Sequence, residues 1–190
     1  MDNNSKYYAW AITIAAAFVG YALWKRGGSS NPPSLINDPN LDMSTNPNLP
    51  RGYRNNNPLN IRYVAGNNWK GKVYPNTDRN NTFEQFVNIA YGYRAALSLM
   101  RTYIRKYGCN TVQKIIAKWA PENENNTAAY IQHVCEIANL APDTLVAQNS
   151  RDTLTKMAYA MSIIENGNTA ETREAGLPDM NIINEAWEIL

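Results

Sequence analysis

The stretch RDTLTKMAYAMSIIENGN, residues 151–168, has the pattern of an amphipathic helix that ends in a carboxylate. Four of its residues recur at helical spacing, at steps of four, three and four: Leu154, Ala158, Met161 and Glu165. An Asn-Gly pair follows the glutamate and is typical of a helix end. The pattern predicts a packed helix with a glutamate at the carboxyl end of its apolar face.

A carboxylate in that position is disfavoured for two reasons. The helix macrodipole is negative at the carboxyl end, and an apolar surrounding removes water from the charge. Both effects favour the protonated acid, which is the form that a general acid needs when a glycosidic bond breaks. The alternative is that Glu165 lies in a frayed last turn and points to water.

Apolar residues also recur at three- and four-residue steps in further segments, which predicts four more helices. Gly108 is expected to close the first of them, Asn110 or Thr111 to begin the second, and Thr127 to begin the third. Their expected ranges are residues 93–107, 112–119, 127–137 and 181–190.

Between residues 51 and 75 the chain is instead dense in Asn, Gly and Pro. Two short runs, NIRYV at residues 60–64 and KGKVY at residues 70–74, are expected to pair as a small β-hairpin across Gly66, Asn67 and Asn68. We therefore expect a mainly α domain with one small β-hairpin.

The amino-terminal part has a different character. Residues 7–24 carry no charge and would form a helix about 27 Å long, close to the thickness of a bilayer core. Aromatic residues stand at both ends, and Lys25 and Arg26 follow, which favours a retained membrane anchor over a cleaved signal peptide. We assign residues 1–26 to a single transmembrane anchor, residues 27–50, with five prolines, to a flexible linker, and residues 51–190 to the folded domain.

Charge is unevenly distributed along the domain. Residues 51–120 contain twelve lysines and arginines and two acids, a net charge of +10. Residues 121–190 contain three lysines and arginines and eleven acids, a net charge of −8. The basic half could face an anionic polymer, or the two halves could simply neutralise each other. Cys109 and Cys135 fit small core residues better than a disulfide, and His133 fits a surface position. No metal and no cofactor is expected.

Three stretches together carry a family resemblance: RGYRNNNPLNIR, then FEQFVNIAYGYRAA with its continuation to WAPENENNTAAYI, and finally AMSIIENG. They resemble the lysozyme-like domains of tailed and membrane-containing bacteriophages, which occur in virion structural proteins and peptidoglycan hydrolases. The resemblance spans residues 51–190. It also extends to glucosaminidases and lytic transglycosylases of the lysozyme superfamily, in which a helix ends in Glu-Ser-Gly. There the glutamate comes before the asparagine-rich and Trp-x-Gly elements, so the correspondence implies a circular permutation.

The resemblance implies that Glu165 is the general acid that protonates the oxygen between N-acetylmuramic acid and N-acetylglucosamine. Asp78 is the candidate for a second acid, and Glu84 comes next unless it is merely solvated. Since lytic transglycosylases act with one acid, transglycosylation is slightly favoured over hydrolysis. The residues expected to bind substrate are Asn57, Asn60, Arg62, Trp69 and Tyr91, with core packing as the alternative for the aromatic rings.

These features predict a membrane-anchored enzyme that degrades peptidoglycan, located in a virion with an internal membrane or on a bacterial membrane. Its expected partners are peptidoglycan, a lipid membrane through residues 7–24, and other virion proteins. The first alternative is a non-catalytic virion structural or wall-binding protein with the same fold. The second, less favoured, is nucleic-acid contact through Arg94, Arg101 and Arg105.

Overall fold

The computed structural model of the protein describes residues 41–123 and 125–190, all of which belong to one compact unit. The predicted mainly α architecture is confirmed, and the described residues contain isolated β-bridges but no strand. The elements are η3 (Met43–Thr45), α2 (Arg51–Arg54), η4 (Arg79–Asn81), α3 (Ile89–Tyr107), α4 (Val112–Trp119), α5 (Thr127–Ala138), α6 (Arg151–Asn166), α7 (Ala170–Glu174) and α8 (Met180–Glu188).

The predicted membrane anchor and the part of the predicted linker at residues 27–40 lie outside the described residues. Among the helices that are described, none has the length and apolar character needed to cross a bilayer.

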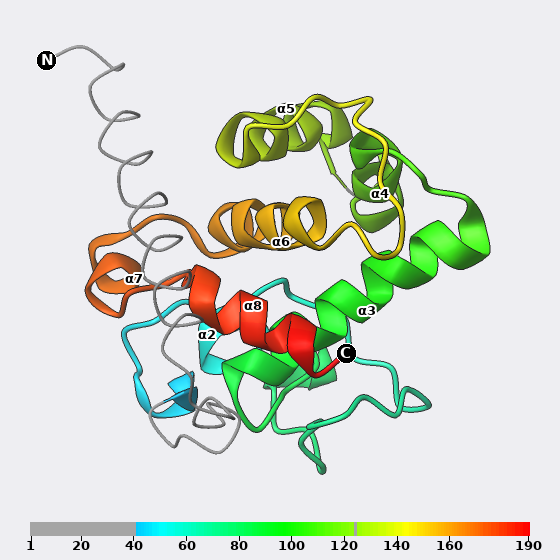
Figure 1. Ribbon diagram of the computed structural model, residues 1–190. Coiled ribbons are helices and arrows are strands. Elements are labelled where there is room, and N and C mark those ends of the chain that lie inside the picture. The colour runs from blue at the N-terminus through cyan, green and yellow to red at the C-terminus, as the bar shows by residue number, and fades with distance from the viewer. Residues whose placement is uncertain (1–40, 124) are drawn as a thin grey trace, which may run out of the picture. The chain divides into compact units, whose positions relative to one another are not determined.

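Helix α6 is the central element, because it contacts α2, α3, α5 and α8 (Figure 1). Leu154, Ala158 and Met161, which define its predicted apolar face, are all fully buried. Burying a side chain such as leucine or methionine contributes about 1.5–3 kcal/mol, so this face anchors the domain. The helix ends at Gly167, which has a φ of 76°.

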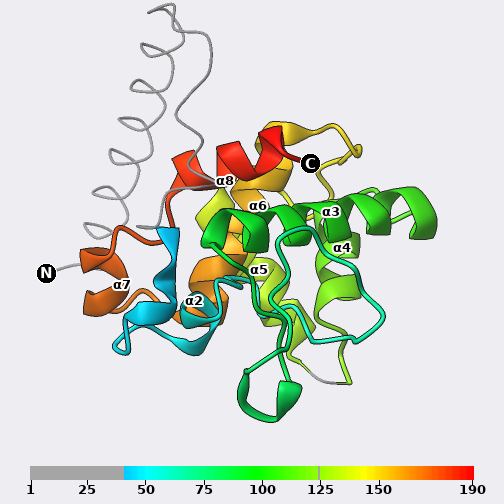
Figure 2. The same ribbon diagram turned by 90° about the horizontal axis from the view of Figure 1, so that it is seen from below.

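Two pairs of helices pack most closely in the domain. One is α5 with α6, and the other is α3 with α8 (Figure 2). The Asn88 side chain caps α3 at its start, and Gly108 ends it in the left-handed conformation, as the sequence predicts. Arg94 donates a hydrogen bond to the carbonyl of Ile189, and the Arg101 guanidinium lies 5.5 Å from the centre of the Trp187 ring. Two of the three arginines on this face of α3 therefore contact the carboxyl-terminal segment of the same chain.

Helix α5 follows α4 along the chain and packs against it. The Thr111 side chain caps α4, one of the two predicted starts. The cap of α5 differs from the prediction, because Asn126 accepts the hydrogen bond from Ala129 N. Thr127 instead donates from its hydroxyl to the carbonyl of Ala120, 2.5 Å away, and so ties the start of α5 to the end of α4.

Part of the predicted linker belongs to the folded domain. Leu41 and Leu49 are both buried in the hydrophobic core. The Asn56 side chain accepts a hydrogen bond from Met43 N and donates one to Asp42 Oδ1, each at 2.8 Å. The domain therefore begins before residue 51, because two leucines between the prolines bury their side chains against it.

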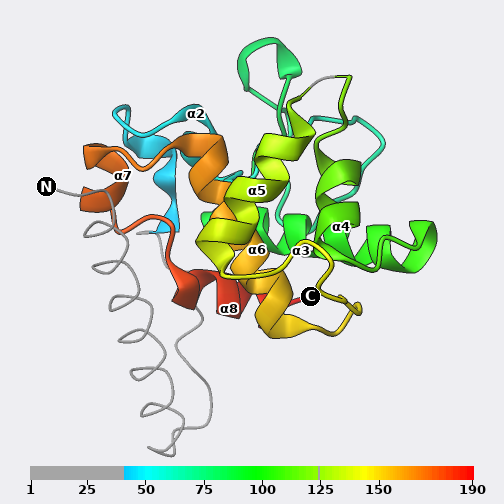
Figure 3. The same ribbon diagram turned by 90° about the horizontal axis from the view of Figure 1, so that it is seen from above.

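The predicted pairing of residues 60–64 with residues 70–74 is wrong. Both segments pair instead with residues 82–87: Arg62 forms an antiparallel bridge with Phe83, and Lys72 forms one with Phe86. Backbone hydrogen bonds from Glu84 N to Ile61 O and from Val73 N to Gln85 O, both 2.8 Å long, support the two bridges. This arrangement buries Phe86 in the core. The loop around residues 76–82 projects beyond the end of α5 (Figure 3).

Candidate functional site

The Glu165 carboxylate lies where three segments of the chain meet. It is half-buried in the last turn of α6, as the helical pattern predicts. The Tyr130 hydroxyl, from α5, donates a hydrogen bond to Glu165 Oε1 at 2.9 Å. The Asn60 amide nitrogen, from the asparagine-rich loop, donates one to Glu165 Oε2, also at 2.9 Å. Both carboxylate oxygens therefore have a donor within the protein, and the two donors precede Glu165 in the chain by 105 and 35 residues.

Tyr130 is fixed as a neutral phenol. Burial raises the pKa of Tyr130 well above its ordinary value, and the charge of the neighbouring Glu165 raises it further. A neutral phenol can donate its own proton and can also accept a hydrogen bond, so this contact persists whether the Glu165 carboxyl group is ionised or protonated.

The loop that carries Asn60 is built from asparagines. Asn60 itself has a φ of 49°, a left-handed conformation that asparagine tolerates better than most residues. Asn57 is completely buried, and its side chain accepts a hydrogen bond from Ile61 N and donates to the carbonyls of Ile61 and Glu84. Every polar atom of the Asn57 side chain thus has a partner within the protein. Asn57 shapes the loop, whereas Asn60 is the member of this pair that reaches Glu165.

Gly52 and Asn166 complete the support of the site. The Asn166 amide nitrogen donates to the carbonyls of Pro58 and Ser162, which joins the end of α6 to the loop. A Cβ atom built on Gly52 would lie 2.3 Å from Asn166 Oδ1 and 2.7 Å from Asn60 Oδ1. The two amides therefore occupy the space that a side chain at position 52 would need.

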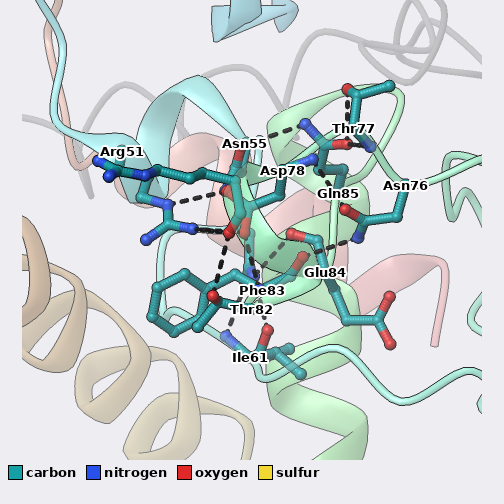
Figure 4. Close-up of polar contacts among 12 residues, drawn as sticks. Arg51, Asn55, Ile61, Asn76, Thr77, Asp78, Thr82, Phe83, Glu84 and Gln85 are labelled. Atoms are coloured by element: carbon teal, nitrogen blue, oxygen red, sulfur yellow. Dashed lines mark hydrogen bonds and ion pairs between the residues drawn. The ribbon is translucent and has the colours of Figure 1, made fainter.

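Asp78 is held in a network of its own (Figure 4). Its carboxylate accepts hydrogen bonds from Arg51 Nε and Nη2, from the Asn55 amide at 2.8 Å and from Phe83 N at 2.9 Å. Burial acts to raise the pKa of Asp78, but the hydrogen bonds from Arg51, Asn55 and Phe83 outweigh it and lower the pKa below its ordinary value. The structure thus places Asp78 as an ionised group that fastens α2 to the segment before α3.

Glu84 is fully buried and not solvated. Its side chain points away from Asp78 (Figure 4) and forms an ion pair with Lys72, with 3.1 Å between Nζ and Oε2. Lys72 Nζ also donates to the carbonyls of Val64 and Asn67 and lies 4.5 Å from the centre of the Tyr63 ring. This pair holds the irregular segment together and does not reach Glu165.

The three remaining predicted substrate-binding residues lie in or near that segment. Trp69 is half-buried and packs against the core, and its buried indole nitrogen has no hydrogen-bond partner within the part of the chain that the structure describes. The Tyr91 ring is covered on one side by Gly71, whose ideal Cβ would lie only 2.3 Å from the ring. Arg62 is exposed, next to its bridge with Phe83. Arg62 therefore projects to the surface, and the two aromatic rings serve largely in packing.

Sequence reasoning missed Tyr130 as a member of the site. It stands on the apolar face of α5 and has the spacing of a core residue. Nothing local in the sequence distinguishes it, because its contact with Glu165 spans 35 residues along the chain.

Cys109 and Cys135 are both free thiols. Within residues 41–123 and 125–190, no group of three or more His, Cys, Asp or Glu side chains is arranged to hold a metal ion.

The domain also has an open groove of about 540 Å³. It is lined mainly by apolar atoms of α4, α5 and the segment that follows them, among them Gln113, Ile131, Cys135 and Leu140. Neither Glu165 nor Tyr130 lines it, so the groove and the carboxylate are separate features.

The fold and the site define a class: a small helical domain with one half-buried carboxylate at a helix end, held by a neighbouring helix and an asparagine-rich loop. No family model matches the chain. The chain is 39% identical over 127 residues to protein P5 of Pseudoalteromonas phage PM2, and the match covers 64% of this chain and 74% of the relative. At that identity and coverage, the chain belongs to the family of this bacteriophage protein.

Proposed function

We propose that the chain is a virion protein of a bacteriophage and that its folded domain cleaves peptidoglycan between N-acetylmuramic acid and N-acetylglucosamine. The observation that carries the proposal is the carboxylate of Glu165, half-buried at a helix end and held by Asn60 and Tyr130. Kinship to a phage protein supports the virion assignment. The resemblance to lysozyme-like domains supports the substrate.

Glu165 acts as the single acid in this proposal. It protonates the bridging oxygen as the glycosidic bond breaks, and its carboxylate then takes the proton of the muramyl 6-hydroxyl as that oxygen attacks. Asp78 is left out of the chemistry because its oxygens already accept four hydrogen bonds. With one acid, transglycosylation to an anhydromuramyl product is the preferred reaction, and hydrolysis is second.

Arg62 is the proposed contact for the carboxylates of the peptide stems, because it is exposed and belongs to the basic half of the domain. Residues 7–24 anchor the protein in a lipid membrane, which is either the internal membrane of the virion or a bacterial membrane. A chain tethered in this way reaches the wall without diffusing away from it.

The second candidate is a non-catalytic virion structural or wall-binding protein. One observation favours it: both oxygens of Glu165 already have partners, which is also what a structural tie between α5, α6 and the loop requires.

A turbidity assay on purified peptidoglycan separates the two candidates. The full-length chain in detergent is compared with Glu165→Gln and with Glu174→Gln, a matched change at an exposed glutamate of α7. We expect clearing by the wild type and by Glu174→Gln, a loss of at least about 100-fold in Glu165→Gln, and anhydromuramyl fragments by mass spectrometry. Wild-type protein that sediments with peptidoglycan without clearing it is the result expected of a wall-binding protein, and undiminished clearing by Glu165→Gln removes this residue from the mechanism.

A further inference from the structure

Two buried amide oxygens next to Glu165 have no hydrogen-bond partner among the described residues. They are Asn60 Oδ1 and Asn166 Oδ1. Both lie against Gly52, at 2.7 and 2.3 Å from the position that a Cβ would take there, so the two oxygens are neighbours. An acceptor buried without a donor is unfavourable by about 1–3 kcal/mol, and two of them at one place need a physical reason.

The reason lies in the orientation of the Asn60 amide. With Glu165 ionised, the carboxylate requires a donor, and Asn60 Nδ2 faces Oε2 at 2.9 Å. The same nitrogen makes a long contact of 3.5 Å with the backbone carbonyl of Glu165, which a turn of the amide would give up. That orientation turns Asn60 Oδ1 inward, toward the oxygen of Asn166. The orientation of Asn166 cannot change to compensate, because its Nδ2 donates to Pro58 O at 2.7 Å and to Ser162 O at 2.9 Å.

A half turn of the Asn60 amide reverses the arrangement. The oxygen and nitrogen of an asparagine amide have nearly the same shape, so the turn exchanges acceptor and donor without a change in packing. Asn60 Oδ1 would then face Glu165 Oε2 and accept a hydrogen bond from it when Oε2 carries a proton. Asn60 Nδ2 would face Asn166 Oδ1 and donate to it, so that both unpartnered oxygens gain a donor.

We propose that the Asn60 amide turns over with the protonation of Glu165, and that Asn60 and Asn166 together stabilise the protonated acid. Proton uptake from solvent forms one O–H bond on Oε2 and breaks one O–H bond of hydronium, which leaves as water. After Glu165 gives up the proton, the amide returns and donates to the carboxylate. Asn60 and Asn166 are positioning residues in this scheme, whose catalytic meaning rests on the function proposed above.

The other groups around Glu165 do not compete for this role. Tyr130, from α5, is the titratable side chain in contact with the carboxylate, and it faces Oε1. Of the charged residues on α2, Arg51 is paired with Asp78, and Arg54 is exposed. On α3, Arg94 contacts Ile189 and Arg101 contacts Trp187. On α8, Glu188 is paired with Arg151. Burial, together with the charge of Asp179, raises the pKa of Glu185 to about 7. Within the described parts of the chain, no charged side chain forms an ion pair with Glu165.

The test is a pair of NMR titrations on the isotopically labelled full-length chain in detergent. The carboxyl carbon of Glu165 reports its protonation, and the nuclear Overhauser effect between the Asn60 side-chain NH₂ and the α-hydrogens of Gly52 reports the amide orientation. We expect the Asn60–Gly52 effect below the Glu165 titration midpoint and its absence above it. In Glu165→Gln, which cannot titrate, the Asn60 signals should not respond to pH over the same range. An Asn60 orientation that is the same on both sides of the wild-type midpoint overturns the proposal.

Asn166→Ala gives the second measurement. It removes the acceptor that the turned amide needs, so the titration of Glu165 should move to lower pH by about one unit. An unchanged or upward shift in a folded variant contradicts the proposal, and if this variant does not fold the nuclear Overhauser test on the wild type still decides. These readouts do not depend on activity: a switch without clearing of peptidoglycan refutes the proposed function alone, and clearing without a switch refutes this inference alone.

Discussion

Replacement of Gly52 by alanine tests the packing beneath the Glu165 site. The new Cβ would lie 2.3 Å from Asn166 Oδ1, 2.7 Å from Asn60 Oδ1 and 3.2 Å from Asn166 Cγ, far inside van der Waals contact. Overpacking of this kind destabilises by about 1–3 kcal/mol, and a displaced amide adds about 1 kcal/mol for each hydrogen bond it loses. We therefore expect Gly52→Ala to lower the free energy of unfolding by about 2–4 kcal/mol.

Thermal unfolding of the full-length chain, followed by circular dichroism, measures this effect. For a domain of this size the expected loss corresponds to a decrease in Tm of roughly 5–15 °C. Gly66→Ala is the matched control, because a Cβ there meets no atom of the described residues within 4 Å, and it should change the free energy of unfolding by less than about 0.5 kcal/mol. Gly92→Ala should be the most severe of the three, because its Cβ would lie 2.0 Å from the backbone oxygen of Asn56. Equal Tm values for the Gly52 and Gly66 variants would refute the reasoning.

Three further changes probe the supports around the site. Lys72→Met leaves the fully buried Glu84 without its cation and should destabilise by about 3–5 kcal/mol in urea unfolding, whereas adding Glu84→Leu should recover much of that loss; a double variant no more stable than the single one contradicts this account. Asp78→Asn should lower stability at pH 7 by about 1–2 kcal/mol. Because hydrogen bonds lower the folded pKa of Asp78 from 3.8, this difference from wild type is fully present above about pH 4 and is lost as the pH falls through the folded pKa. A difference that does not decrease as the pH is lowered from about 4 argues against the ion pair as its source. Asn88→Ala removes the cap of α3 and should reduce stability by about 1 kcal/mol, measured as a shift of the urea midpoint; no shift would mean that water replaces the cap without loss.

The position of Glu165 follows from local sequence. The spacing of Leu154, Ala158 and Met161 predicts a helix face, and the same spacing continues to the glutamate. The structure confirms that face, since all three apolar residues are fully buried. Periodicity is reliable here because a helix repeats within a few residues and its apolar side must be buried.

The pairing of the irregular segment could not be read in the same way. Residues 60–64 and 70–74 look like two arms of a hairpin, but both pair with residues 82–87. Short alternating runs are compatible with several partners, and the choice among them depends on which pairing buries Phe86 and matches Lys72 with Glu84.

The chain on its own determines that this is a mainly helical domain in which a carboxylate ends the central helix, because helix periodicity and end signals act over short distances. Only the tertiary structure decides what that carboxylate meets. Tyr130 and Asn60 approach Glu165 from positions 35 and 105 residues away along the chain. Asp78 has the same chemistry as Glu165, yet the fold commits it to Arg51. Two acids with the same functional group thus acquire different environments, because long-range packing sets which donors reach each one.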